Sequence, residues 1–218
     1  MSIFDEFIKQ TLLINLDRRH DRLEASKLQL MEVGWSSWSR FSAIEKHPPH
    51  VGFNRSQIEC FKLLKDVSGP VAVLEDDIFF PFDADTTDDI MRLAISSLPH
   101  NWEVIYLGAM VFSGEFRGHV ISNNLVTANG VVCTHGMIYN TGVLKRILDG
   151  FDRAAVYPVK SNIYDCWLAN NYHRRGTCFL INPMVAWQAA GYSDLSNQAS
   201  VGTGMFELTQ LKIDKIFQ

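Results

Sequence analysis

The chain has 218 residues, 47% of them hydrophobic and 20% charged, with a formal net charge of −4 at pH 7. This composition predicts a globular domain with a sizeable core and excludes a largely disordered chain. The acidic balance argues against binding through a broad basic surface, so nucleic acid is a disfavoured partner, although the sequence still allows a local basic patch.

The N-terminus carries Asp5, Glu6 and Lys9 and lacks a basic stretch followed by an apolar one, so no signal peptide is expected. No apolar window reaches the length of a membrane span. The cysteines have neither Cys-x-x-Cys nor zinc-site spacing, which predicts free, buried or half-buried thiols. These four residues are Cys60, Cys133, Cys166 and Cys178. The expected location is the cytoplasm.

Apolar runs without Gly or Pro predict buried strands in the first half of the chain. These runs are residues 11–16, 71–74 and 102–107, and a further strand is expected around 39–43. Amphipathic spacing predicts helices at residues 18–33, 54–67 and 88–97, and Gly34 and Ser68-Gly69-Pro70 end the first two. The His-Pro-Pro-His segment at 47–50 is expected to be a loop.

The second half continues the alternation less clearly. Residues 129–139 contain strand material, 143–149 and 162–173 are predicted helices, and 178–181 is a short strand. Residues 189–204, rich in Gly, Ser, Ala and Asn, are expected to form a long loop of the kind that is often functional.

Strands that alternate with helices predict a single α/β domain over residues 1–218, with a mostly parallel central sheet and helices on both faces. Ligands of such sheets bind beyond the carboxyl ends of the strands. The polar clusters directly after strands are therefore site candidates. They are residues 17–22, residues 75–77 and the stretch after Leu107.

Three consecutive acids, Glu75, Asp76 and Asp77, directly follow the strand at 71–74. Neighbouring carboxylates repel one another, and burying them without a counter-charge is costly. Mn²⁺ or Mg²⁺ would relieve that cost. Alternation along an extended chain puts Glu75 and Asp77 on one side, which favours Asp77 with Glu75 or Asp76 as ligands. The alternative is a charged turn whose acids cap the region at 83–89 or pair with arginines.

Three arginines, Arg18, Arg19 and Arg22, follow the first strand and its Asn15. Guanidinium groups bind phosphate through two parallel hydrogen bonds, and a helix N-terminus favours anions. A phosphate site is one interpretation. The other is a helix with ordinary ion pairs between successive turns, such as one involving Asp21.

These segments, taken in order, resemble glycosyltransferase family 25, the lipopolysaccharide-biosynthesis and collagen-galactosyltransferase type. Asn-Leu-x-Arg-Arg-x-x-Arg at 15–22 and Leu-Glu-Asp-Asp at 74–77 carry most of the resemblance. Residues 102–108 are similar to the family's Trp-Asp-x-x-x-Leu-Gly, whereas Thr134 to Tyr139, Tyr164-Asp165 and Ser193-Asp194 match more loosely. Gln57 stands where the family usually has His.

The resemblance implies a GT-A-like, Rossmann-like fold, with a nucleotide-sugar half at about 10–110 and an acceptor half at about 111–218. It also implies an inverting transfer of a hexose, often galactose, from a UDP-sugar with Mn²⁺ or Mg²⁺. Asp77 with Glu75 or Asp76 would hold the cation. The residues around the nucleotide would be Asn15, Arg18, Arg19 and Arg22.

An inverting transfer needs a base that deprotonates the acceptor hydroxyl. Asp165 is the first candidate, with a helix N-cap as the alternative, and Asp194 is the second, with a solvated turn as the alternative. His135 either lines the site or packs in the core. Trp167 and Trp187 either stack on a sugar or pack in the core.

Two rival functions remain at the level of sequence. A metal-dependent nucleotidyltransferase or phosphatase also places acids after a strand, and a non-catalytic sugar-nucleotide-binding relative would agree with Gln57. The acceptor stays open among a saccharide, a lipid-linked saccharide, a protein hydroxyl group and a modified nucleic-acid base.

Overall fold

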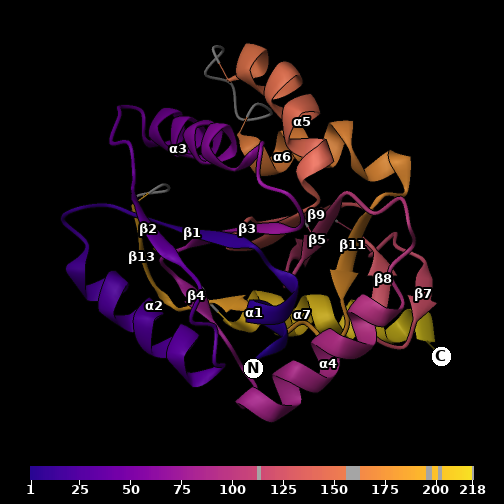
Figure 1. Ribbon diagram of the computed structural model, residues 1–218. Coiled ribbons are helices and arrows are strands. Elements are labelled where there is room, and N and C mark those ends of the chain that lie inside the picture. Colours follow the sequence, from indigo (N-terminus) through magenta and orange to yellow (C-terminus); the bar gives the residue numbers. More distant parts are fainter. Residues whose placement is uncertain (112–113, 156–162, 195–197, 201–202, 218) are drawn as a thin grey trace.

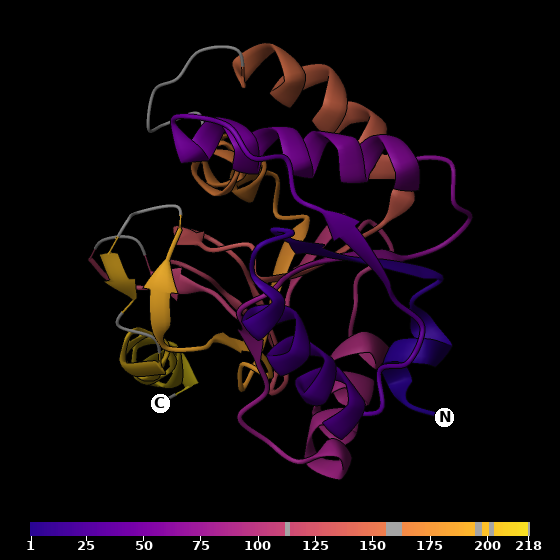
Figure 2. The same ribbon diagram turned by 90° about the vertical axis from the view of Figure 1, so that its left-hand side faces the viewer.

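An eight-stranded sheet with the order β2-β1-β3-β10-β5-β11-β8-β7 forms the centre of the chain (Figure 1). The computed structural model describes residues 1–111, 114–155, 163–194, 198–200 and 203–217. Helices cover both faces of the sheet, as Figure 2 shows from the side. The predicted α/β class is confirmed.

Most strands of this sheet run in one direction. With β3 (Val71–Glu75) as the reference, its neighbour β1 (Gln10–Asn15) is parallel to it, and β2 (Ser39–Ser42) is parallel to β1 at the edge of the sheet. Two strands run the opposite way, β10 (Gly136–Tyr139) and β8 (Leu125–Thr127). The remaining strands share the direction of β3, and they are β5 (Val104–Tyr106), β11 (Cys178–Ile181) and β7 (Val120–Ser122).

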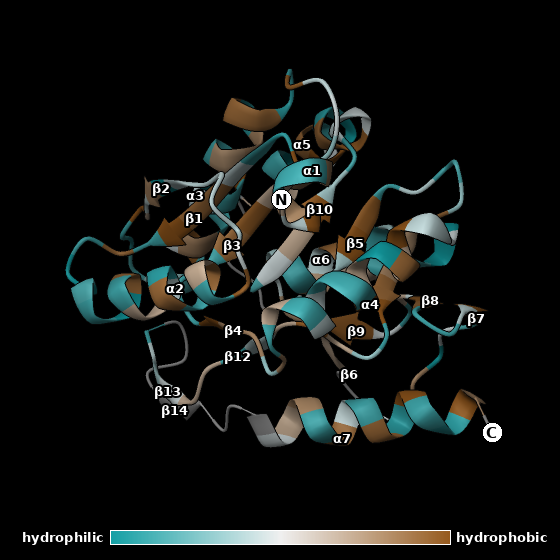
Figure 3. Cartoon of the chain, turned by 60° about the horizontal axis from the view of Figure 1, so that its bottom comes forward, coloured by the Kyte–Doolittle hydropathy of each residue, from teal (hydrophilic) through white to brown (hydrophobic). Residues whose placement is uncertain are grey.

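Alternate side chains of the central strands point into two cores. Leu12 and Val73 belong to the core on one face, whereas Leu13 and Leu74 belong to the core on the other. A strand buried on both faces must be apolar at every position, which is why these runs could be recognised in the sequence. Figure 3 shows these strands in brown between helices with teal outer faces.

Three helices cover each face of the sheet. One set is α3 (Pro49–Leu64), α5 (Thr141–Ala154) and α6 (Tyr164–Asn171). The other set is α1 (Ile3–Phe7), α2 (His20–Glu32) and α4 (Ala84–Ser96). A C-terminal helix, α7 (Thr203–Asp214), packs beside the sheet against two short strands, β6 (Met110–Val111) and β12 (Trp187–Gln188).

The observed helices differ from the predicted ones mainly at their starts. The predicted loop at 47–50 is wrong at its end, because α3 already begins at Pro49, a residue suited to a first helical turn. Helix α4 also begins early, because the side chain of Asp83 caps it by accepting from Thr86 N at 2.8 Å. Helix α5 likewise extends beyond 143–149 in both directions.

Several short elements escaped prediction. They are α1, α7, β4 (Ile78–Phe79), β6, β7, β8, β12, a hairpin of β13 (Gly191–Ser193) with β14 (Gln198–Ser200), and the 3₁₀ turns His173–Arg175 and Lys215–Phe217. The hairpin and the start of α7 replace the long loop expected at 189–204. Residues 195–197 and 201–202 of that segment, and Asn162 of the predicted helix at 162–173, lie outside the described residues.

All four cysteines are free, and three of them are buried, as expected. The strand material predicted at 129–139 divides into β9 (Val131–Val132) and β10. Among the described helices, none has the length and apolar character needed to cross a bilayer.

Candidate functional site

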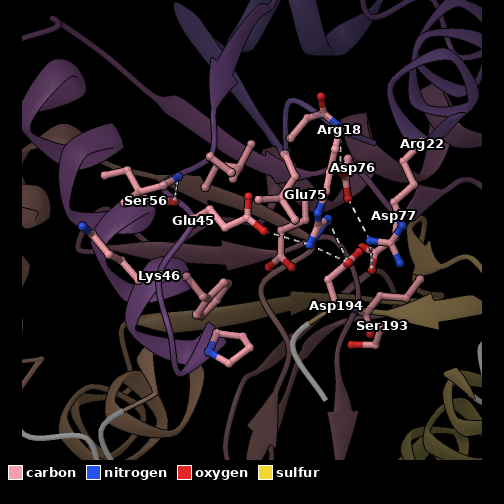
Figure 4. Close-up of a pocket in the computed structure, with 18 residues that line it drawn as sticks. Arg18, Arg22, Glu45, Lys46, Ser56, Glu75, Asp76, Asp77, Ser193 and Asp194 are labelled. Carbon is pink, nitrogen blue, oxygen red and sulfur yellow. Dashed lines mark hydrogen bonds and ion pairs between the residues drawn. The ribbon is translucent and has the colours of Figure 1, made fainter. Parts of the chain in front are cut away.

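A cleft opens beyond the carboxyl ends of β1, β2 and β3, and its empty space, counted out to the opening, is about 870 Å³. The cleft collects most of the site residues expected from sequence, which Figure 4 draws together. These are Asn15, Arg18, Arg22, Glu75, Asp76, Asp77 and Asp194.

Parallel pairing brings the ends of two strands together in this cleft. Ile14 on β1 lies opposite Glu75 on β3, so Asn15 and Asp76 leave the sheet side by side. The Asn15 Nδ2 donates to Asp76 Oδ2 at 2.7 Å. A contact across 61 residues of chain thus follows directly from the strand register.

The carboxylate of Asp76 is fully engaged by protein groups. Besides Asn15, the Arg22 guanidinium donates to its Oδ1 at 2.9 Å. Arg40 Nε in turn donates to Asn15 Oδ1 at 2.8 Å, which fixes the orientation of that amide. The alternative of acids paired with arginines therefore holds for Asp76. Arg40 was not predicted, because a lone arginine on an edge strand carries no sequence signal.

Glu75 and Asp77 lack such charge neutralisation. The pKa of Glu75 rises from 4.5 to about 8, because the side chain is buried and lies near the charges of Asp77 and Asp76. The Thr134 hydroxyl, which donates to Glu75 Oε1 at 2.6 Å, lowers this pKa but does not offset the rise. Burial raises the pKa of Asp77 from 3.8 to about 6 and outweighs Arg22, which lies 3.5 Å from Oδ2. Its Oδ1 is buried without a hydrogen-bond partner. A buried, unpaired carboxylate oxygen is costly unless the carboxyl is protonated or meets a cation.

The chemistry of these two carboxylates fits a shared cation better than a closed metal cage. In the part of the chain that the structure describes, no three His, Cys, Asp or Glu side chains are grouped to hold an ion by themselves. Mg²⁺ and Mn²⁺ are commonly held by one or two carboxylates, with waters and substrate phosphates completing the shell. Asp77 and Glu75 could supply the protein's share of such a shell.

The arginines at the rim are bound to the far end of the chain. Arg18 lies 2.9 Å from Asp194, and Arg19, which is beside the cleft rather than among its lining residues, pairs with Asp194 as well. Arg22 Nη2 also donates to the carbonyl of Tyr192 at 2.8 Å. These contacts run across the fold, so they are not the ordinary pairs between helix turns that the sequence also allowed.

The rim pairs have local partners too. Arg19 pairs with Asp21 at 2.8 Å, and these two aspartates keep the pKa of its guanidinium well above the usual range. Arg18 lies 3.2 Å from Glu45. At the cleft rim, the guanidinium groups of Arg18 and Arg19 are thus already paired with carboxylates of the chain itself.

Asp165 lies in the first turn of α6 and is not among the described residues that line the cleft. The helix N-cap is Ile163, so the N-cap alternative for Asp165 is wrong. The Asp165 carboxylate accepts from Cys166 N at 2.6 Å, and its charge is one of those that raise the pKa of Glu75. Asp165 therefore lies within electrostatic range of the acids.

The aromatic candidates and His135 pack in the interior. His135 is fully buried, its Nε2 lies 3.1 Å from the carbonyl of Ala186, and burial lowers its pKa to about 4. Trp187 stacks on Phe206 with ring centroids 6.2 Å apart, and Trp167 is a core residue of α6.

Gln57 is fully buried in α3, and neither of its amide atoms has a hydrogen-bond partner. The residues of α3 that line the cleft are Pro49, Phe53 and Ser56. The position at which this sequence departs from the family pattern is therefore inside the helix packing rather than on the cleft wall.

Comparison with known proteins finds a match in structure but not in sequence. No protein-family model matches the chain, and no curated protein does. A solved glycosyltransferase, involved in the glycosylation of the major capsid of PBCV-1, matches with a TM-score of 0.50 and 11% identity. The match covers 80% of this chain and 81% of that one. The fold is glycosyltransferase-like.

At this identity the likeness establishes the fold alone. It confirms the fold class that the resemblance to family 25 implied, and it leaves membership of that family as a prediction. The division into a nucleotide half and an acceptor half likewise stays a prediction.

Proposed function

We propose that the chain is a glycosyltransferase that moves a hexose from a nucleotide sugar, a UDP-sugar first of all, to an acceptor hydroxyl with inversion. Mn²⁺ or Mg²⁺ is its proposed cofactor. One observation carries the proposal. Two buried carboxyls, Glu75 without an arginine partner among the described residues and Asp77 with Arg22 at 3.5 Å, lie in the same cleft as Arg18 and Arg22, which are suited to phosphate. A cation would neutralise the carboxylates, and a diphosphate would accept hydrogen bonds from the arginines.

The proposed roles divide between two parts of the cleft. Its floor is Glu75 and Asp77, and its rim is Asp194 with the arginines around it. Asp77 and Glu75 would hold the cation, which when bound supplies positive charge for the departing nucleoside diphosphate. Arg18, Arg19 and Arg22 would donate to the phosphates and stabilise the charge that develops on them. The apolar wall formed by residues such as Phe53 would receive the less polar parts of the donor.

The contacts of the two base candidates favour Asp165. The carboxylate oxygens of Asp194 are already engaged by Arg18 and Arg19, so they are not free to receive the proton of an acceptor hydroxyl. The Asp165 carboxylate accepts from Cys166 N at 2.6 Å, and no guanidinium group pairs with it among the described residues. We therefore assign the removal of the acceptor proton to Asp165 and the rim contact to Asp194.

Donor hydrolysis tests the proposal directly. The protein is incubated with Mn²⁺ and a panel of nucleotide sugars, and release of nucleoside diphosphate and free sugar is measured. We expect turnover of at least one UDP-hexose and its loss in Asp77→Asn. The exposed Asp85→Asn, in the first turn of α4, is the matched control and should retain turnover.

The same assay separates the rival functions. Donor binding without hydrolysis would indicate the non-catalytic relative, and release of phosphate or pyrophosphate without free sugar would indicate a phosphatase or nucleotidyltransferase. A second panel of saccharide, lipid-linked, peptide and nucleic-acid acceptors then identifies the acceptor. The configuration of the product shows whether the transfer inverts.

A further inference from the structure

The turn between β9 and β10 holds an unusual backbone conformation. Cys133 has φ of +87° and is the one non-glycine residue with positive φ among those described. A side chain disfavours this region, and the cost is tolerated where surrounding contacts determine the conformation. Cys133 is also buried, so the turn is held within the fold rather than at its surface.

This turn contacts Glu75, one of the two acids at the floor of the cleft, through a side chain and through the backbone. Thr134 Oγ1 donates to Glu75 Oε1 at 2.6 Å, and Glu75 N donates to the carbonyl of His135 at 2.9 Å. The Cys133 Sγ lies 3.8 Å from Gln188 Oε1, and Ala189 N, next along the chain, donates to the backbone carbonyl of Asp77 at 2.7 Å. One turn of the second half of the chain therefore braces Glu75, which comes from the first half.

We propose that Thr134 is a positioning residue that orients the Glu75 carboxylate for the divalent cation. The inference rests on the proposed function, because that function supplies the cation. Among the described residues, the side-chain hydrogen bond to Glu75 goes to Oε1, so Oε2 is left for the ion. Threonine is suited to this task, since its branched side chain has few rotamers and its hydroxyl donates in a defined direction.

Thr134 reaches the cation only through Glu75, so it is not a catalytic residue. Hydrogen-bond partners of metal-binding carboxylates typically contribute about 10-fold to 100-fold in metal affinity. The unusual φ of Cys133 accounts for how the hydroxyl is aimed, because that residue sets the direction in which the next side chain leaves the turn.

Direct titration of Mn²⁺ into the full chain, followed by electron paramagnetic resonance of the free ion, tests the inference without any turnover. Thr134→Val keeps the branched shape and removes the hydroxyl. It should weaken Mn²⁺ binding by about 10-fold or more, and Thr134→Ser should restore affinity to within about 3-fold of the wild type. In a Glu75→Gln background, Thr134→Val should cause no further loss.

Thr127→Val is the matched control for general destabilisation. The Thr127 hydroxyl accepts from His119 N at 2.8 Å, and its strand β8 lies near the edge of the sheet opposite β2. Loss of this hydroxyl should lower the melting temperature and leave Mn²⁺ affinity unchanged. Unchanged Mn²⁺ affinity in Thr134→Val, or equal losses with and without Glu75, would overturn the inference and leave the proposed function intact. A wild-type chain that binds no Mn²⁺ would instead overturn the cation and this inference together.

Discussion

The floor and the rim of the cleft use the same kinds of residue and reach opposite electrostatic states. At the rim, Asp194 lies between Arg18 and Arg19, so the charges of the chain already balance. At the floor, Glu75 has no arginine in contact among the described residues, and Asp77 has one at 3.5 Å. A ligand must therefore compete with a carboxylate at the rim, whereas at the floor it must bring positive charge.

This difference explains why a complex of a cation with a diphosphate suits the cleft better than either ion alone. A free anion gains little at the rim, because it displaces an existing ion pair. A cation gains at the floor, because the carboxyls there are buried without compensation. Each variant described below tests this electrostatic difference between the floor and the rim.

Removing the negative charge of the floor should abolish the proposed reaction and spare the fold. In Asp77→Asn, we expect donor turnover to fall by at least about 100-fold, because several kcal/mol of metal-derived stabilisation are lost. The melting temperature of the metal-free protein should stay constant or rise, since a buried carboxyl without full compensation is removed. Normal turnover in this variant would contradict the assignment of the floor as the cation site.

Removing the one arginine that serves both regions should destabilise the protein most. Arg22 contacts Asp76, Asp77 and the carbonyl of Tyr192, and its side chain is only 17% exposed. In Arg22→Met, we expect about 2–4 kcal/mol less stability in urea unfolding, because a buried carboxylate loses its partner. Adding Asp76→Asn to this variant should recover part of the loss. A double variant no more stable than the single one would show that pairing with Asp76 is not the reason.

The floor also predicts how stability depends on pH when no metal is present. The pKa of Glu75 is about 8 in the fold against 4.5 ordinarily, so between these pH values the folded state binds more protons than the unfolded state. Stability must then fall as pH rises through this window. The pKa of Asp77, about 6, adds to the slope in the lower part of the window.

Thermal unfolding across this pH range measures the slope. Glu75→Gln should flatten it, and Mn²⁺ should stabilise the wild type more at the high-pH end, because the ion binds the deprotonated carboxylates. A wild-type slope that Glu75→Gln leaves unchanged would assign the dependence to other groups.

The smallest effect is expected at the rim and has the opposite sign. In Asp194→Asn, we expect UDP to bind about 3-fold to 10-fold more tightly, because the internal carboxylate no longer competes for Arg18 and Arg19. Asp21→Asn removes the other acid on Arg19, but Asp21 is 66% exposed and should change UDP affinity little. Calorimetric titration with UDP distinguishes the two. Weaker binding in Asp194→Asn would show that Asp194 supports the ligand rather than competing with it.

The sequence revealed the floor better than the rim. Glu75 to Asp77 follow an apolar strand, and that local pattern alone located the end of β3. Arg18, the partner of Asp194, lies 176 residues away in the turn between β1 and α2, and no local pattern reports a contact over that distance. Thr134 shows the same limitation, because its hydrogen bond to Glu75 depends on β10 inserting antiparallel between β3 and β5.

Most of the elements that escaped prediction are too short to show a periodic pattern of apolar residues. Strands of two or three residues, such as Ile78–Phe79 and Trp187–Gln188, are too short to show a period. Helix α1 spans only five residues, so its two buried side chains do not form a recognisable stripe. The starts of α3 and α4 were missed because proline at a first turn and an aspartate cap extend a helix beyond its apolar spacing.

The separation of 176 residues between Arg18 and Asp194 also bears on biosynthesis. A nascent chain on the ribosome can complete β1, α2 and β3 with Arg18 and Arg19 paired only with Glu45 and Asp21, because Asp194 has not yet been made. The two guanidinium groups therefore gain their shared partner only after translation passes residue 194, so this part of the rim is completed late in synthesis.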